Sequence, residues 1–136
     1  LDGLSLADQL DLVQRDLSHY GIEQNKSKTV HLCRLDEFCA EAGVSRIDCM
    51  KIDVEGHELE VLAGAGDLIS SQCIRNLQFE FGAPDIESKT SFKEIYQVLN
   101  PHYNIYRIVH RGLAPIRSYT EFLEVYITAN YLAVAR

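Results

Sequence analysis

The 136-residue sequence has no long hydrophobic run and no excess of positive charge. No stretch approaches the roughly 20 consecutive apolar residues that a membrane-spanning helix needs. Its 13 lysines and arginines are outnumbered by 20 aspartates and glutamates, which gives a net charge of -7 at pH 7. Nucleic acids and anionic membranes attract clustered basic residues, so this charge argues against both as main partners. The first residues also lack the basic and then apolar pattern of a secretory signal.

The four cysteines lack the spacing of a metal site, because there is no CxxC pair and no histidine pair at zinc-finger distance. We therefore expect no bound metal. Cys39 falls on the apolar face of an expected helix and Cys49 inside an expected strand, which favours buried free thiols. Free thiols indicate a reducing compartment, so the sequence predicts a cytoplasmic protein.

Near the middle of the chain, a short apolar strand is expected over residues 48–53 and ends on a carboxylate, Asp53. A helix follows after a tight turn, and a strand that feeds a helix in this way is the core of a βαβ unit. In such sheets, ligands bind beyond the carboxyl ends of the strands. We therefore expect the chemistry to involve Asp53 and Glu55, which lie at that end.

The helix that follows this strand is expected over residues 57–70, where apolar residues recur at helical spacing. Gly56 separates it from the strand and is expected to serve backbone geometry, through a positive φ or a close approach of another segment. Glu58 and Glu60 fall in the first turn, where the helix dipole favours acidic side chains.

The remaining pattern predicts an α/β domain. Strands are expected over residues 29–34, 74–81, 103–109 and 130–135, and helices over residues 7–20, 36–42 and 91–100. Residues 119–126 fit either a helix or irregular structure, and Gly43 is expected as a left-handed helix stop. Because a helix joins the strands at 48–53 and 74–81, we expect these two strands to be adjacent and parallel.

One run of residues carries a resemblance to a known family: Lys51-Ile52-Asp53-Val54-Glu55-Gly56-His57-Glu58. This run resembles the signature of FkbM-type methyltransferases, which are S-adenosylmethionine-dependent enzymes with a Rossmann-like fold that mostly methylate hydroxyl groups. The segments 30–38 and 77–81 also resemble the family's flanking elements. The resemblance assigns residues 29–136 to the carboxyl-terminal part of a methyltransferase domain. Residues 1–28 are interpreted as a helical and loop lead-in.

The resemblance implies a class I methyltransferase sheet, mostly parallel, with an antiparallel pair at one edge. It implies S-adenosylmethionine as cofactor and a hydroxyl of a sugar or small natural product as methyl acceptor. Such enzymes hold the cofactor mainly through a glycine-rich turn in their first half, and the sequence contains no G-x-G-x-x-G. We therefore interpret the amino-terminal half of the domain as missing and assign no cofactor-binding residue. We expect the parent protein to be the active methyltransferase, and the isolated chain to bind S-adenosylmethionine weakly or not at all and to be inactive. The alternative is a catalytically inert α/β module that binds a partner protein.

Two residues are catalytic candidates under this resemblance. Asp53 would orient the acceptor hydroxyl or take its proton, and its alternative role is to cap the following helix. His57 is the rival base, and its alternative is an exposed position in the first helical turn.

Two glutamates are candidates for substrate binding. Glu55 would contact the acceptor at the end of the strand, or it is a solvated residue of the turn. Glu80 lies near the end of the neighbouring strand. Its alternative is a structural ion pair with Lys51, since an ammonium in a central strand is costly to bury without a partner.

Overall fold

The computed structural model describes residues 31–136, of which Arg34–Arg136 form one compact unit. The helix expected over residues 7–20 lies outside the described residues. Of the strand expected over residues 29–34, the described part, 31–34, contains no strand. Within residues 31–136, no helix has both the length and the apolar character to cross a membrane.

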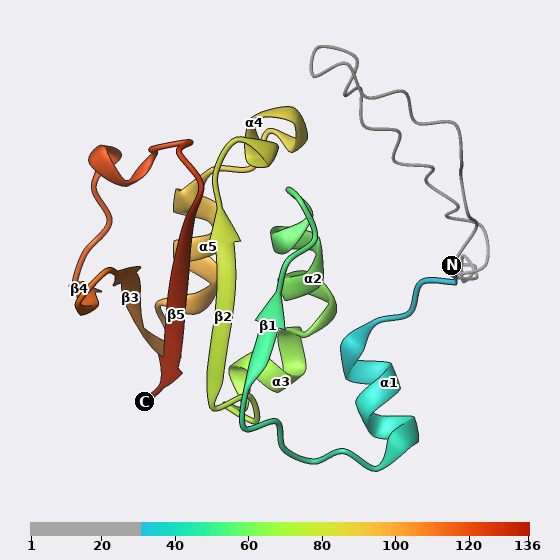
Figure 1. Ribbon diagram of the computed structural model, residues 1–136. Helices are drawn as coiled ribbons and strands as arrows, with labels where there is room; N and C mark the ends of the chain where they lie inside the picture. The colour runs from blue at the N-terminus through green and yellow to red at the C-terminus, as the bar shows by residue number, and fades with distance from the viewer. Residues whose placement is uncertain (1–30) are drawn as a thin grey trace. The chain divides into compact units, whose positions relative to one another are not determined.

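The described chain alternates helices and strands, as Figure 1 shows. In chain order the elements are α1 (Leu35–Ala42), β1 (Met50–Ile52), α2 (Glu58–Gly64), α3 (Gly66–Ser70), β2 (Asn76–Phe81), α4 (Pro84–Ser88), α5 (Phe92–Leu99), β3 (Tyr103–Val109), β4 (Gly112–Ile116), a 3₁₀ turn (Glu121–Leu123) and β5 (Ala129–Ala135). The α/β class and most of the expected elements are therefore confirmed, with α4 and β4 as additions.

The strands form one five-stranded sheet in the order β1-β2-β5-β3-β4. β1 and β2 are adjacent and parallel, as predicted, and the other three pairs are antiparallel. The expectation of a mostly parallel sheet is therefore wrong, and the sheet is mixed. The reason is β5, which enters between β2 and β3 and runs against both (Figure 1). β1, β2 and β3 consequently share one direction, and β4 extends the edge beyond β3.

The hydrophobic core lies on one face of the sheet, where α2, α3 and α5 stand behind the strands in Figure 1. β2 alternates strictly, with Leu77, Phe79 and Phe81 fully buried on the core face. Phe79 stacks on Tyr131 of β5 with ring centroids 5.3 Å apart. Full burial of such a side chain contributes about 2–3 kcal/mol, so the aromatic contacts of β2 and β5 fix the register of the sheet. Glu80 consequently points to the opposite face.

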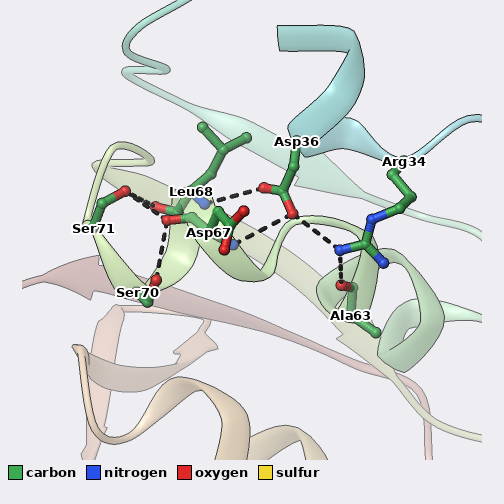
Figure 2. Close-up of polar contacts among 7 residues, drawn as sticks. All are labelled: Arg34, Asp36, Ala63, Asp67, Leu68, Ser70 and Ser71. Atoms are coloured by element: carbon green, nitrogen blue, oxygen red, sulfur yellow. Dashed lines mark hydrogen bonds and ion pairs between the residues drawn. The ribbon is translucent and has the colours of Figure 1, made fainter. Parts of the chain in front are cut away.

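The helix expected over residues 57–70 is interrupted at Ala65, which separates α2 from α3. The residues at the start of α1 satisfy the polar groups exposed by this break (Figure 2). The Asp36 carboxylate accepts hydrogen bonds from the backbone N–H groups of Asp67 (3.3 Å) and Leu68 (3.1 Å). Arg34 Nη2 donates to Asp36 Oδ2 and to the Ala63 carbonyl, both at 3.2 Å. We call this group the Arg34–Asp36 clamp.

Helix α1 ends at Gly43, whose φ of 68° confirms the predicted left-handed stop. Cys39 is buried on the inner face of this helix, as expected, at 3% exposure. Cys49 is exposed, which contradicts the expectation of a buried thiol. The reason is that β1 begins only at Met50, so Cys49 lies in the preceding loop rather than inside the strand.

The two additional elements, α4 and β4, were not predicted because each contains a proline, which is atypical of helices and strands. α4 is a single turn that begins at Pro84, a residue whose fixed φ suits the first helical position. β4 has the sequence Gly-Leu-Ala-Pro-Ile, and its Pro115 lies opposite Tyr106 of β3. Proline has no N–H to donate, so within a sheet it is found on edge strands, which is where β4 lies.

Candidate active site

The carboxyl ends of β1 and β2 lie side by side, below α4 in Figure 1. The last pair in register is Ile52 and Phe79, so Asp53 and Glu80 stand level one residue further on. Neighbouring strands are about 4.8 Å apart. Both Ile52 and Phe79 face the core, and the alternation of a strand therefore directs Asp53 and Glu80 to the opposite face. The structure thus brings together two of the residues that the sequence predicted.

Asp53 holds the ammonium of Lys51, with Lys51 Nζ 2.6 Å from Asp53 Oδ2. The predicted ion pair between Lys51 and Glu80 is therefore wrong. In the register of the sheet Lys51 lies beside Gln78, two residues short of the level of Glu80, and the carboxylate that it contacts is Asp53, the first residue after β1. The hydrogen bond and the charge of Asp53 raise the pKa of Lys51. The Asp53 side chain does not cap α2, whose first residue is preceded by His57 without a side-chain cap.

The turn after Asp53 has an unusual backbone. Glu55 has a φ of 57° and Gly56 a φ of 101°. A Cβ added at Gly56 would lie 2.7 Å from the carbonyl oxygen of Pro84 at the start of α4. Both expectations for Gly56, positive φ and close approach, are confirmed. The left-handed conformation of Glu55 costs about 1 kcal/mol or more, and it persists because surrounding contacts hold the turn.

Glu58 provides those contacts, although nothing in the sequence pattern singled it out. The residue is 2% exposed, and its two carboxylate oxygens accept backbone N–H groups from Gly56 (2.9 Å) and Val54 (3.2 Å). Sequence reasoning treated it as one of two acids in the first helical turn. The other, Glu60, has a side chain that is 62% exposed. The one sequence feature that distinguishes Glu58 from Glu60 is the turn glycine two residues before Glu58. A tight turn there leaves backbone N–H groups that need an acceptor, and Glu58 is close enough to provide it.

His57 lies at the amino end of α2, and its Nδ1 is 3.8 Å from Glu60 Oε2 on the same helix. Its side chain is 39% exposed. This geometry agrees with the alternative interpretation of an exposed residue in the first turn. The catalytic assignment of His57 stays a prediction.

Glu80 is half-buried, and its carboxylate makes no hydrogen bond or ion pair with any other residue in the described part of the chain. Burial raises the pKa of the Glu80 carboxyl, and the charges of Asp53, Glu55 and Glu58 raise it further. The charge of Lys51 lowers the pKa and is the smallest of these effects. Glu80 is therefore a carboxylate surrounded by like charges and without a partner of its own among these residues.

Asp85 on α4 is a second buried acid at this end of the sheet, and sequence reasoning missed it. It is 2% exposed, its Oδ2 accepts the Gly82 N–H at 2.8 Å, and its Oδ1 is buried without a partner among the described residues. Burial raises the pKa of Asp85 to about 6. The Gly82 hydrogen bond opposes the shift, and the charge of Glu58 adds to it.

The segment that precedes β5 closes on the same end of the sheet. A Cβ added at Gly82 would lie 2.5 Å from the Cα of Thr128. Segments from four parts of the chain therefore meet at the candidate site: the turn after β1, the end of β2, α4 and the residues before β5. We refer to Asp53, Glu55, Glu58, Glu80 and Asp85 as the strand-end carboxylates. In residues 31–136, no three acidic, histidine or cysteine side chains are arranged to hold a metal ion.

Comparison with known protein families gives a match over most of the chain. The family model described as "Methyltransferase FkbM domain" matches residues 4–108, which is 105 of the 136 residues. The matched range includes β1, the turn with Gly56, and β2 with Glu80. No curated protein and no solved structure matches the chain.

Proposed function

The chain belongs to the FkbM methyltransferase family, and from this premise we propose that it serves S-adenosylmethionine-dependent methyl transfer to a hydroxyl group. The observation that carries the proposal is the position of the family's signature run in the fold. The run forms β1 and the turn after it, so that its carboxylates stand at the end of the parallel pair of strands, β1 and β2. This end of a parallel pair is where α/β sheets bind their ligands.

The sheet supports a Rossmann-like interpretation of the described part. β1, β2 and β3 run in one direction, and the helices that connect them lie on one side of the sheet (Figure 1). We propose that these elements correspond to the carboxyl-terminal half of a class I methyltransferase sheet. β5 then accounts for the antiparallel strand that such sheets carry.

The chemistry of the strand-end carboxylates fits part of the cofactor. When bound, S-adenosylmethionine supplies a methyl group that its positively charged sulfonium has already activated. The combined charge of Asp53, Glu55 and Glu80 would favour that cation, because Lys51 pairs with one of these three carboxylates, Asp53. We assign no residue to the adenosine end, because the sequence has no G-x-G-x-x-G.

We propose a sugar or small natural product as the acceptor. The residues of this chain have two tasks: to hold the acceptor hydroxyl in line with the methyl group, and to take its proton. Glu55 and Glu80 were predicted to bind the substrate, and Asp53 was predicted to orient the hydroxyl or take the proton, with His57 as its rival. Carboxylates suit the first task because they accept hydrogen bonds from hydroxyl groups.

An inert α/β interaction module is the second candidate, and the missing glycine-rich motif favours it. Titrating the ¹⁵N-labelled 136-residue chain with S-adenosylmethionine or S-adenosylhomocysteine, followed by NMR, separates the two. The methyltransferase proposal predicts affinity weaker than micromolar. It also predicts amide shifts confined to residues 53–58 and 80–85, with tighter binding of the cationic S-adenosylmethionine. Shifts scattered over other elements, or equal binding of S-adenosylmethionine and S-adenosylhomocysteine, would favour the inert module.

A further inference from the structure

Building on the proposed function, we infer that Glu80 is the group that takes the proton of the acceptor hydroxyl, and that Asp53 positions that hydroxyl. The sequence predicted Asp53 as the base, with His57 as its rival and Glu80 as a substrate-binding residue. The contacts of these three side chains favour Glu80, rather than Asp53 or His57, as the group that takes the proton.

Asp53 is poorly placed to take a proton, because its Oδ2 is held 2.6 Å from the Lys51 ammonium. The pair is in contact with solvent, with side-chain exposures of 57% for Lys51 and 45% for Asp53. A fixed, charged carboxylate in this position is suited to accept a hydrogen bond from the acceptor and hold it in place.

His57 is also poorly placed. Its Nδ1 is directed at Glu60, one turn further along α2, rather than at the strand ends. Glu60 is a surface residue with a 62% exposed side chain. This contact gives the imidazole a partner outside the group of strand-end carboxylates.

Glu80 has the opposite environment. It stands level with Asp53 across the parallel pair, its carboxylate has no partner in the described part of the chain, and it is half-buried. Asp53, Glu55 and Glu58 all oppose its negative charge, so a proton on Glu80 relieves repulsion instead of breaking a bond. The pKa of Glu80 is accordingly raised, first by burial. A base is most effective when its pKa approaches the working pH.

Glu58 keeps this environment constant. Its carboxylate is fixed by the N–H groups of Val54 and Gly56, so its charge cannot move away from Glu80. The same two hydrogen bonds hold the turn that follows Asp53. Glu58 is therefore a positioning residue for both Asp53 and the charge around Glu80.

The step balances with one methyl donor and one hydroxyl acceptor. The acceptor oxygen forms a bond to the methyl carbon, and the carbon–sulfur bond breaks with both electrons remaining on sulfur. The hydroxyl proton passes to the Glu80 carboxylate and leaves from there to water.

The first test needs no cofactor. In the chain with ¹³C-labelled glutamate, the side-chain carboxyl carbon of Glu80 is followed by NMR as the pH is raised. We expect the pKa of Glu80 to lie above its ordinary value of 4.5 and to fall in Glu58→Gln, which removes one opposing charge. Glu60→Gln is the matched control on the same helix and should leave Glu80 unchanged. A Glu80 pKa at or below 4.5, or a Glu80 pKa that is the same in the wild type and in Glu58→Gln, would overturn the inference.

The second test measures transfer of a labelled methyl group to a panel of methyl glycosides and small alcohols. Glu80→Gln should lower turnover roughly 100-fold, with partial rescue in Glu80→Asp, because a lost acid–base group has that effect. Asp53→Asn should act mainly on KM, His57→Ala should lower turnover less than Glu80→Gln, and Glu60→Ala should match the wild type. Full activity of Glu80→Gln beside a 100-fold loss in Asp53→Asn would return the role to Asp53. These variants are compared in a form of the protein that includes the expected amino-terminal half of the domain. If the wild type of that form transfers no methyl group, the proposed function fails, and the carboxyl titration still decides how Glu80 is tuned.

Discussion

The Arg34–Asp36 clamp and the strand-end carboxylates are both built from acidic side chains that accept backbone N–H groups, yet they are satisfied to different degrees. In the clamp, both Asp36 oxygens have partners: Leu68 donates to Oδ1, and Asp67 and Arg34 donate to Oδ2 (Figure 2). At the strand ends, Glu58 uses both oxygens, Asp85 uses one, and the Glu80 carboxylate uses none with the described residues.

This difference separates a structural role from a chemical one. A carboxylate whose hydrogen bonds are complete stabilises the fold, and its cost of burial is offset. A half-buried carboxylate beside like charges and without a partner costs stability, and such groups concentrate at functional sites. The comparison leads to predictions for the removal of side chains at the two sites and for the pH response of Asp85.

The largest effect should follow from removing Glu58, the strand-end residue that most resembles the clamp. Glu58→Ala leaves the N–H groups of Val54 and Gly56 without their acceptor in a buried turn, and we expect a loss of about 3 kcal/mol in the free energy of unfolding. Urea denaturation measures it. Glu60→Ala is the matched control on the same helix, with an expected change within about 0.5 kcal/mol. Equal effects of the two substitutions would show that Glu58 does not hold the turn.

The next effect concerns the pH dependence of Asp85, the strand-end carboxyl with one unsatisfied oxygen among the described residues. The folded state raises the pKa of Asp85 from 3.8 to about 6, so folding favours its protonated form. The stability this gives is complete below pH 3.8 and is lost as the pH rises through 6. Between pH ~4.5 and ~7.5 we expect a loss of about 2 kcal/mol relative to Asp85→Asn, measured by urea denaturation at each pH. Parallel pH profiles for the two proteins would contradict the buried, half-satisfied carboxyl.

The smallest effect is expected at the clamp itself. Asp36→Ala removes the acceptor for the first N–H groups of α3, and we expect a loss of about 1.5 kcal/mol, as for other helix caps. Amide exchange of Asp67 and Leu68 should accelerate at the same time. Glu37→Ala, one residue further along α1, is the exposed control. If Asp36→Ala and Glu37→Ala have the same free energy of unfolding, the clamp contributes no stability.

Local patterns were sufficient to predict much of the fold. Alternation predicted β3 with the bounds that the structure has, Tyr103–Val109, and helical spacing predicted α5, which also has a capping box between Ser91 and Glu94. The parallel pairing of β1 and β2 followed from the helix between them. The insertion of β5 between β2 and β3 was not predictable in this way, because it depends on pairing between segments that are far apart in the chain.

The same distinction between local patterns and long-range contacts applies to the candidate site. The end of a strand can be located from its sequence, so Asp53 and Glu80 were found as neighbours at one edge. The partner of each charge depends on register and burial, so the pairing of Lys51 with Asp53 was missed. The burial of Glu58 and Asp85 was missed for the same reason, since acids at helix starts are usually exposed.

Pro115 in β4 has a consequence for how the protein behaves at high concentration. An outermost strand offers unpaired backbone groups to any other extended chain, and this is a common route to aggregation. In β4 the backbone bonds on one side pair with β3, while the missing N–H of Pro115 interrupts the row of donors on the strand. Proline is one of the residues that edge strands use against intermolecular pairing, and in β4 it accompanies the partly exposed Leu113.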